Sequence, residues 1–292
     1  MTKRRFYSII LWYVDERDFS LRRLRANEPL VPQDRCLSDA AERWVSDMPR
    51  FFVEPHAVEN GHIVICGEDA HHMTHVLRMR CGESVVVCVP DTGIEYETTF
   101  VSGGDPVLLQ IVSEKRTETE PPYKAVVYQA LCKGDKMETV IQKAVETGAV
   151  RIVPIITSRA TVKWDPKDGA RKVDRWQKIA SEAAKQCGRG VIPTVASPMR
   201  FADALDEIAG WDLPLFCYEG EGVRSLPRCT DAVDGIPEKI AIVVGPEGGF
   251  APEEAEMARK RGIQMCGLGK RILRTETAAV FVLACLSQTY EM

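Results

Sequence analysis

The sequence predicts an α/β fold, in which a C-terminal, mostly parallel sheet follows a small β-barrel domain. Two observations carry this prediction. From residue 125 onward, candidate strands alternate with candidate helices, and the helices tend to end at a glycine, which is typical of a parallel sheet covered by helices. From Phe51 to about Lys115 the chain carries short segments rich in valine and isoleucine, which favour a small barrel. The segment Thr117–Lys124, with two adjacent prolines, is typical of an interdomain linker.

The barrel region contains a hairpin signal and one short helix. Asp91-Thr92-Gly93 separates two candidate strands, as expected of a tight turn. The segment Asp69–Arg78 predicts the helix, with Asp69 near its N-cap. The candidate strands are His62–Cys66, Ser84–Val89, Ile94–Val101 and Val107–Val112.

The C-terminal region ends in an unusually apolar helix. Residues Ala278–Leu286 are apolar nearly all the way round, so we expect this helix to be covered on every side. Thr275 is its expected N-cap and Glu276 lies in its first turn. The preceding strands are expected at Ala125–Leu131, Arg151–Ile156, Leu213–Tyr218, Ile240–Val244 and Ile263–Leu268, and the helices at Asp135–Thr147, Asp168–Cys187, Glu253–Arg261 and Glu276–Tyr290.

Composition narrows the class of protein. A chain of 292 residues with a net charge of −4 has no basic excess, so any nucleic-acid site must be a local patch. No apolar run approaches the roughly 20 residues that span a bilayer, and we expect no membrane partner. The ten cysteines form no C-x-x-C pair, which signals neither zinc nor a redox pair and favours reduced thiols in a cytoplasmic protein.

Two glycine-marked turns carry the functional signal. Val244-Gly245-Pro246-Glu247-Gly248-Gly249-Phe250 follows one candidate strand, and Leu268-Gly269-Lys270-Arg271-Ile272-Leu273-Arg274 follows the next. Glycine lets a ligand approach the backbone closely, and the carboxyl ends of neighbouring strands are where an open α/β sheet binds small molecules. Neither G-x-G-x-x-G nor a P-loop pattern occurs, so no dinucleotide or P-loop nucleotide site is implied.

This pair of turns closely resembles the cofactor pocket of the SPOUT-class RNA methyltransferases. In particular, it resembles the RsmE family, which methylates N3 of a uridine in small-subunit (16S) ribosomal RNA using S-adenosylmethionine. The resemblance implies a trefoil knot in the C-terminal sheet, a homodimer built with the last helix, and ribosomal RNA, within the assembled 30S particle, as partner. It implies a leader at residues 1–47, a PUA-like RNA-binding barrel at 48–116, a linker at 117–124 and the methyltransferase domain at 125–292. The cofactor is then expected on Gly245, Glu247, Gly248, Gly249, Leu268, Gly269, Ile272 and Leu273.

The first 47 residues do not match the family. Met48 stands where the family's initiator would be, and our hypothesis is that translation starts there. A real but poorly ordered tail is the alternative. A secretory signal is disfavoured, because the apolar run Phe6–Val14 ends in Asp15-Glu16-Arg17-Asp18 without a small-residue cleavage site.

Methyl transfer to uracil N3 requires few catalytic side chains. The imide proton must leave, so either a base takes it or a cation stabilises the resulting anion. Arg274, beside the second turn, is our choice for the cation. Glu276 or Glu247 is the candidate base; alternatively, Glu276 only complements the helix N-terminus and Glu247 only holds its loop shut.

RNA contacts are expected in two places. In the barrel, Gly67–Arg80 matches the family's H-x-x-x-V-L-R stretch, and His72, Arg78 and Arg80 form a polar patch beside Arg50. In the second domain, Arg159, Lys163 and Arg189 are expected to face RNA phosphates. A solvated or salt-bridged surface is the alternative for both patches.

All five histidines fall between His56 and His75, and the i, i+4 pair His71 and His75 has a spacing that can chelate zinc. No third ligand is evident, so we expect no metal.

Three rival functions remain: a SPOUT enzyme acting on another RNA, a non-catalytic RNA-binding protein, and a hydrolase using the histidines.

Overall fold

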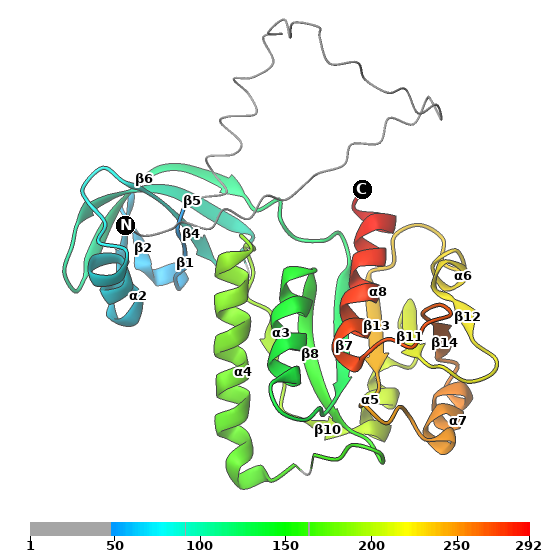
Figure 1. Ribbon diagram of the computed structural model, residues 1–292. Helices are drawn as coiled ribbons and strands as arrows, with labels where there is room; N and C mark the ends of the chain where they lie inside the picture. Colours follow the sequence, from blue (N-terminus) through cyan, green and yellow to red (C-terminus); the bar gives the residue numbers. More distant parts are fainter. Residues whose placement is uncertain (1–47, 91, 163) are drawn as a thin grey trace, which may run out of the picture. The chain divides into compact units, whose positions relative to one another are not determined.

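The structure is a computed structural model that describes residues 48–90, 92–162 and 164–292. The proposed leader at residues 1–47, the hairpin residue Asp91 and the candidate RNA contact Lys163 lie outside these residues. The α/β class predicted from the sequence is confirmed, with a mixed N-terminal sheet and a parallel C-terminal sheet (Figure 1).

The N-terminal sheet has the order β1-β4-β5-β6-β3-β2. Its neighbours are antiparallel except β1, which pairs in parallel with β4. Strand β1 was not predicted, because three residues are too few for a periodic pattern. The strands are β1 (Arg50–Phe52), β2 (Val58–Glu59), β3 (His62–Ile65), β4 (Ser84–Val89), β5 (Ile94–Ser102) and β6 (Val107–Arg116), with a 3-10 turn η1 (Pro55–Ala57).

The helical segment expected at Asp69–Arg78 begins and ends two residues earlier. It comprises α2 (Gly67–His71), followed by a π-helical turn, η2 (His72–Val76). Cys66 is the N-cap, and Asp69 lies near it, in the first turn of the helix. The carboxylate of Asp69 binds the Lys185 ammonium at 2.9 Å.

The C-terminal sheet has the order β10-β8-β7-β13-β11-β14-β12, with β9 beside β8, and all of its pairs are parallel. The strands are β7 (Lys124–Ala130), β8 (Ala149–Ile156), β9 (Thr194–Val195), β10 (Met199–Arg200), β11 (Leu213–Cys217), β12 (Arg224–Ser225), β13 (Lys239–Val244) and β14 (Gln264–Gly267). The five longer strands match the predicted ones within two residues at each end. The two-residue strands were not predicted.

Helices cover both faces of this sheet, and the strands alternate between two buried cores. On one face, Val127, Ile152 and Ile242 pack with helices α3, α4, α6 and α8; on the other, Tyr128 and Val153 pack with α5 and α7. The helices are α3 (Lys136–Glu146), α4 (Pro166–Gln186), α5 (Phe201–Ile208), α6 (Leu226–Thr230), α7 (Pro252–Lys260) and α8 (Thr275–Tyr290).

Helix α8 differs from the prediction in its N-cap and in how much of its surface is buried. Its N-cap is Arg274, not Thr275, which is the first helical residue. One stripe of α8, including the side chain of Phe281 at 37% exposure, is not covered by the described residues; its members are Thr277, Phe281, Ala284 and Gln288. No described helix, α8 included, is both long and apolar enough to cross a membrane.

Candidate cofactor-binding site

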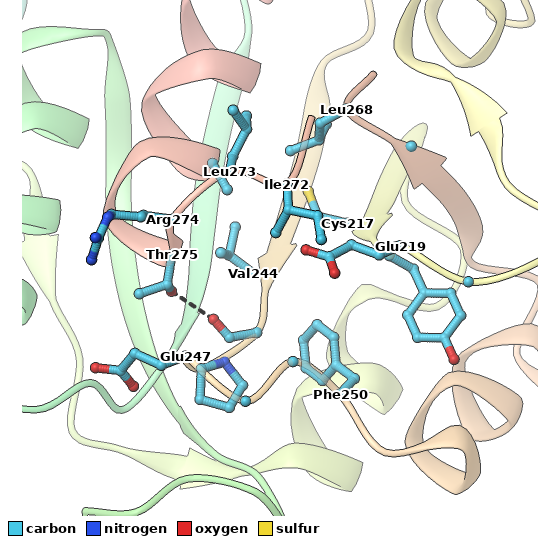
Figure 2. A pocket seen from close by; sticks show the side chains of 18 of the residues that line it. Cys217, Glu219, Val244, Glu247, Phe250, Leu268, Ile272, Leu273, Arg274 and Thr275 are labelled. Carbon is cyan, nitrogen blue, oxygen red and sulfur yellow. Dashed lines mark hydrogen bonds between the residues drawn. The ribbon is translucent and has the colours of Figure 1, made fainter. Parts of the chain in front are cut away.

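The two glycine-marked turns meet at the carboxyl edge of the parallel sheet. They follow β13 and β14, the strands that flank β11. With the segment that follows β11 they enclose a cavity of 890 Å³ (Figure 2). Every residue that we predicted to hold the cofactor lines this cavity: Gly245, Glu247, Gly248, Gly249, Leu268, Gly269, Ile272 and Leu273. The candidate catalytic residues Arg274 and Glu276 line it as well.

The first turn, residues 245–250, is tightly built. The Gly249 amide donates to the Pro246 carbonyl at 2.9 Å. A Cβ on Gly245 would lie 3.1 Å from the Phe250 ring, so this position has no room for a side chain. Phe250 in turn packs on Phe216 in the core, with ring centroids 4.2 Å apart. The turn is therefore anchored to the sheet through its last residue.

The glycines of the two turns differ in what they require. Gly249 and Gly269 have φ of +63° and +111°, which side chains of L-residues rarely adopt. Gly248 is not in this region, and a Cβ there would make an ordinary 3.7 Å contact with the Arg159 Cβ. The backbone conformation therefore favours glycine at Gly249 and Gly269, whereas at Gly248 it does not.

The second turn, residues 268–274, offers apolar side chains to the cavity. Ile272 is 80% exposed although it lines the cavity. Figure 2 shows Leu268 and Leu273 on the same side of the opening as Ile272. An apolar side chain this exposed at the mouth of a cavity favours contact with a ligand that covers it.

A third wall was missed by the sequence prediction. Cys217, Tyr218, Glu219 and Gly220, at the end of β11, also line the cavity. The signal was present, because Glu219-Gly220-Glu221-Gly222 follows the predicted strand with two glycines, as the other turns do. In Figure 2 the Glu219 carboxylate lies across the cavity from Arg274 and Glu247.

The two candidate bases have different surroundings. The Glu247 carboxylate accepts from the Lys136 ammonium at 2.9 Å and from the Lys133 amide at 3.2 Å. Partial burial raises the pKa of Glu247, but these hydrogen bonds outweigh it and hold that pKa below its ordinary value. Glu247 is therefore a weak proton acceptor that holds its loop. Glu276 is half-buried, and its Oε2 is buried with no hydrogen-bond partner among the described residues.

Comparisons with known proteins agree with this geometry. Residues 119–287 match the RNA methyltransferase domain family, and residues 65–112 match the RNA methyltransferase PUA domain family. The chain is 34% identical over 252 residues to the ribosomal RNA small subunit methyltransferase E of Bacillus subtilis, covering 84% of this chain and 98% of that protein. The chain belongs to the ribosomal RNA small subunit methyltransferase E family.

Solved structures of methyltransferase E and related proteins have the same fold. A methyltransferase from Legionella pneumophila, in complex with S-adenosylmethionine, superposes with a TM-score of 0.73 at 32% identity, over 83% of this chain and 98% of that one. A methyltransferase E from Neisseria gonorrhoeae bound to S-adenosylmethionine superposes with a TM-score of 0.74 at 28% identity, over the same shares of the two chains.

Two of the arginines that we expected on the RNA-binding surface of this methyltransferase E family member are held in ion pairs. Arg189 is 3% exposed; its guanidinium forms an ion pair with Glu120 and donates to the Val145 and Ala149 carbonyls. Arg50 is paired with the buried Glu95 at 2.6 Å. The buried Arg189 guanidinium has its donors occupied and cannot meet a phosphate in solvent, so that assignment is wrong. Arg50 is partly buried, and its RNA contact stays a prediction.

The remaining candidate RNA contacts are exposed. His72, Arg78 and Arg80 lie on the surface of the barrel domain, where Val76 is 62% exposed and Leu77 is 41% exposed. Arg159 is exposed but does not extend the surface of α4 as expected. It lies on the rim of the cofactor cavity, where its guanidinium donates to the Gly248 carbonyl at 3.3 Å.

The histidine pair forms a stack rather than a metal site. The His71 and His75 rings are nearly parallel, with centroids 4.4 Å apart, and the His75 Nδ1 lies 2.8 Å from the Thr74 hydroxyl. Within residues 48–90, 92–162 and 164–292, no three His, Cys, Asp or Glu side chains are arranged to bind a metal ion.

Proposed function

We propose that this chain transfers a methyl group from S-adenosylmethionine to N3 of a uridine in small-subunit (16S) ribosomal RNA. The observation that carries the proposal is the cavity at residues 217–220, 245–250 and 268–274, in a chain whose relatives carry that enzyme name and bind that cofactor. A SPOUT enzyme acting on another RNA is the alternative.

The residues of the cavity fit this cofactor. The cavity combines apolar side chains with glycine backbone, as a site for a nucleoside requires. Nothing within 4 Å would obstruct a Cβ at Gly249 or Gly269, so the backbone there is open to a ligand. Leu268, Ile272 and Leu273 offer a surface for the adenine ring, and the Glu219 carboxylate offers an acceptor for hydroxyl or ammonium groups.

When bound, S-adenosylmethionine supplies a methyl group activated by a sulfonium centre. The side chains of this protein then have to bring uracil N3 into line and manage its proton. The guanidinium of Arg274 is permanently charged and offers paired donors to the oxygens that flank N3. Glu276 is our candidate for the proton acceptor, since Glu247 is held in an ion pair with Lys136.

RNA binding must come from local patches, because the net charge of −4 disfavours it overall. In the barrel domain, exposed cations stand beside the exposed apolar side chains of Val76 and Leu77. Such a surface combines phosphate contacts with base contacts. The cations are His72 when protonated, Arg78 and Arg80.

A trefoil knot and a homodimer complete the proposal. The chain leaves β14, near the edge of the sheet, and returns as α8 to pack against the central strands β7 and β13, a crossing of the kind that a knot needs. The uncovered stripe with Phe281 on α8 supports a second copy of the chain as its cover. We place the reaction in the cytoplasm on the assembled 30S particle; the nine described cysteines, all free, suit a reducing compartment.

Three measurements on the unmodified protein test these proposals. We expect calorimetry to detect S-adenosylmethionine binding, and mass spectrometry of digested RNA to detect 3-methyluridine after incubation with 30S particles lacking the modification. Naked 16S RNA should be a poorer substrate. Binding without methylation of any ribosomal RNA would favour another RNA as substrate, and absence of binding would favour a non-catalytic RNA-binding protein. Sedimentation gives the oligomeric state, and a monomer would refute the dimer.

A further inference from the structure

The hydroxyl of Thr275 lies between two parts of the cofactor cavity. Thr275 begins α8, directly after Arg274 and the second turn. Its Oγ1 donates to the carbonyl oxygen of Gly245, the first residue of the first turn, at 2.6 Å (Figure 2). The residue is 7% exposed, so water does not compete freely for this bond.

A buried glutamine completes the arrangement from the central strand. Gln129, at the end of β7, has no exposed surface, and its Nε2 donates to the Thr275 Oγ1 at 2.8 Å. The same nitrogen donates to the Ala130 carbonyl at 3.1 Å and lies 3.4 Å from the Cys132 sulfur. The Ala130 carbonyl can only accept a hydrogen bond, and it fixes the orientation of the amide, because the reversed amide would place two oxygens against each other.

The hydrogen bonds run in one direction, from Gln129 to Thr275 to Gly245. A hydroxyl has one proton to donate, and the lone pair facing Gln129 is already used. The Thr275 proton is therefore committed to the Gly245 carbonyl, which fixes the peptide plane before Pro246. The amide oxygen of Gln129 is buried with no partner among the described residues, which costs free energy that an apolar side chain would avoid. Stability alone is thus a poor reason for an amide here.

We infer that Gln129 and Thr275 are positioning residues that fix the first cofactor turn against the start of α8, and with it Arg274, which directly precedes Thr275. This inference rests on the proposed function and goes beyond it, since neither residue was among the predicted site residues. The Thr275 side chain holds the first turn, while its backbone begins the helix that ends the second turn. Loss of the hydroxyl releases the Gly245 peptide and loosens the first helical residue after Arg274.

The test compares Thr275→Val, Thr275→Ser, Gln129→Met and the double variant Thr275→Val/Gln129→Met with a matched control elsewhere in the chain. Thr275→Val removes the hydroxyl at nearly constant volume, and Thr275→Ser retains it. Gln129→Met removes the donor. Thr139→Val is the control, because the exposed Thr139 also donates to a backbone carbonyl, that of Asp135, outside the cavity. Circular dichroism at 25 °C checks that each variant is folded; if Thr275→Val is not folded, Gln129→Met, which removes the donor to the Thr275 hydroxyl, takes its place in the comparison.

The first readout needs no cofactor. In amide hydrogen exchange we expect Thr275→Val to speed exchange in the segment 245–250, where the Gly249 amide is hydrogen-bonded, on the order of tenfold, the size of losing one buried hydrogen bond. Thr139→Val should leave exchange in this segment unchanged. Equal exchange in Thr275→Val and the unmodified protein overturns the inference whatever the protein binds.

The second readout is S-adenosylmethionine affinity by calorimetry. We expect about tenfold weaker binding in Thr275→Val and Gln129→Met, near-complete rescue in Thr275→Ser, and a double variant no worse than Thr275→Val, because both residues act through one hydroxyl. Fully additive losses of affinity would show that Gln129 does not act through the Thr275 hydroxyl. An unmodified protein that binds no S-adenosylmethionine refutes the proposed function instead, and the exchange result still decides the inference.

Discussion

The two turns that line the cofactor cavity each follow a strand and carry glycine near their start, but they are held very differently. The first, residues 245–250, is held by Thr275 at the Gly245 carbonyl, by Lys133 and Lys136 at the Glu247 carboxylate, and by Arg159 at the Gly248 carbonyl. In the second, no residue from 268 to 273 makes a hydrogen bond to any described residue outside regular secondary structure. The first turn is preorganised, whereas the second has few internal restraints.

The difference indicates a division of labour within the site. A preorganised backbone costs little conformational entropy when a ligand binds, whereas an unrestrained segment has to be ordered at that moment. The unrestrained turn also carries the exposed Ile272 and leads directly to Arg274. We therefore expect the first turn to contribute most of the cofactor affinity. The second turn should close over the bound cofactor and position Arg274 for the reaction.

The largest expected effect is at Arg274, at the end of the unrestrained turn. Arg274→Ala should retain S-adenosylmethionine binding but lose methyl transfer by about a hundredfold or more, the scale of removing one donor to the transition state. Arg274→Lys should fall between, since it keeps the charge but loses the planar fork. A higher pH should partly rescue the alanine variant, because more uracil is then already deprotonated.

A single-turnover assay at neutral pH measures this. Arg228→Ala, which removes an exposed arginine on α6 outside the cavity, is the control and should turn over normally. Normal turnover of Arg274→Ala would show that Arg274 is not the stabiliser. Loss of ribosomal RNA binding instead would make it a phosphate anchor.

The two positive-φ glycines test the comparison directly. Gly249→Val and Gly269→Val should each weaken S-adenosylmethionine binding tenfold or more, since a β-branched residue strains this backbone by about 1–2 kcal/mol and occupies ligand space. Only Gly249→Val should also lower the thermal unfolding midpoint clearly, because its restrained turn cannot relax. Gly235→Val, at φ +75° outside the cavity, should bind normally. Equal losses of stability at positions 249 and 269 would refute the difference between the turns.

The sequence predicted the glycine turns well because their chemistry is local. Each turn directly follows a predicted strand, and the residues that line the cavity are adjacent in sequence. Arg189 and Arg50 could not be assigned in this way. Their ion pairs depend on Glu120 and Glu95, which lie 69 and 45 residues away along the chain. A basic side chain looks the same in sequence whether it faces solvent or a buried carboxylate.

Thr275 illustrates the same limit at a functional position. Its place before an apolar helix predicts an N-cap, yet Arg274 takes that place and the hydroxyl is used across the sheet at Gly245 and Gln129. The fold brings together β7, β13 and α8, which are separated by 30 to 146 residues. Local propensity cannot anticipate a partner at that separation. It locates the helix start to within one residue but not the role of the side chain.

Arg189 supplies a prediction of stability rather than of RNA binding. Arg189→Ala leaves the Glu120 carboxylate and two backbone carbonyls without their donor, which should destabilise the protein by about 3 kcal/mol. Chemical denaturation measures this. Arg78→Ala, at an exposed site, should leave stability unchanged and weaken RNA binding, more so at low salt. An Arg189→Ala variant of normal stability that binds RNA poorly would restore our original assignment.

The smallest expected effect is at the carboxylate that helps to hold the first turn. Glu247 has a pKa below its ordinary value of 4.5, because hydrogen bonds from Lys136 and the Lys133 amide outweigh the effect of burial. A carboxylate with a lowered pKa stabilises the fold above its unfolded pKa, and this contribution disappears as the pH falls through the folded pKa. Glu247→Gln should therefore lower the unfolding midpoint slightly at pH 7, and the deficit should shrink as the pH falls through the folded pKa, because the native carboxyl is then protonated as well. Lys136→Met should give the same pattern, whereas Glu253→Gln, a change at an exposed position in the first turn of α7, should not. A deficit of equal size above and below the folded pKa would mean that the ion pair does not hold the turn, and that the shape of the Glu247 side chain matters instead of its charge.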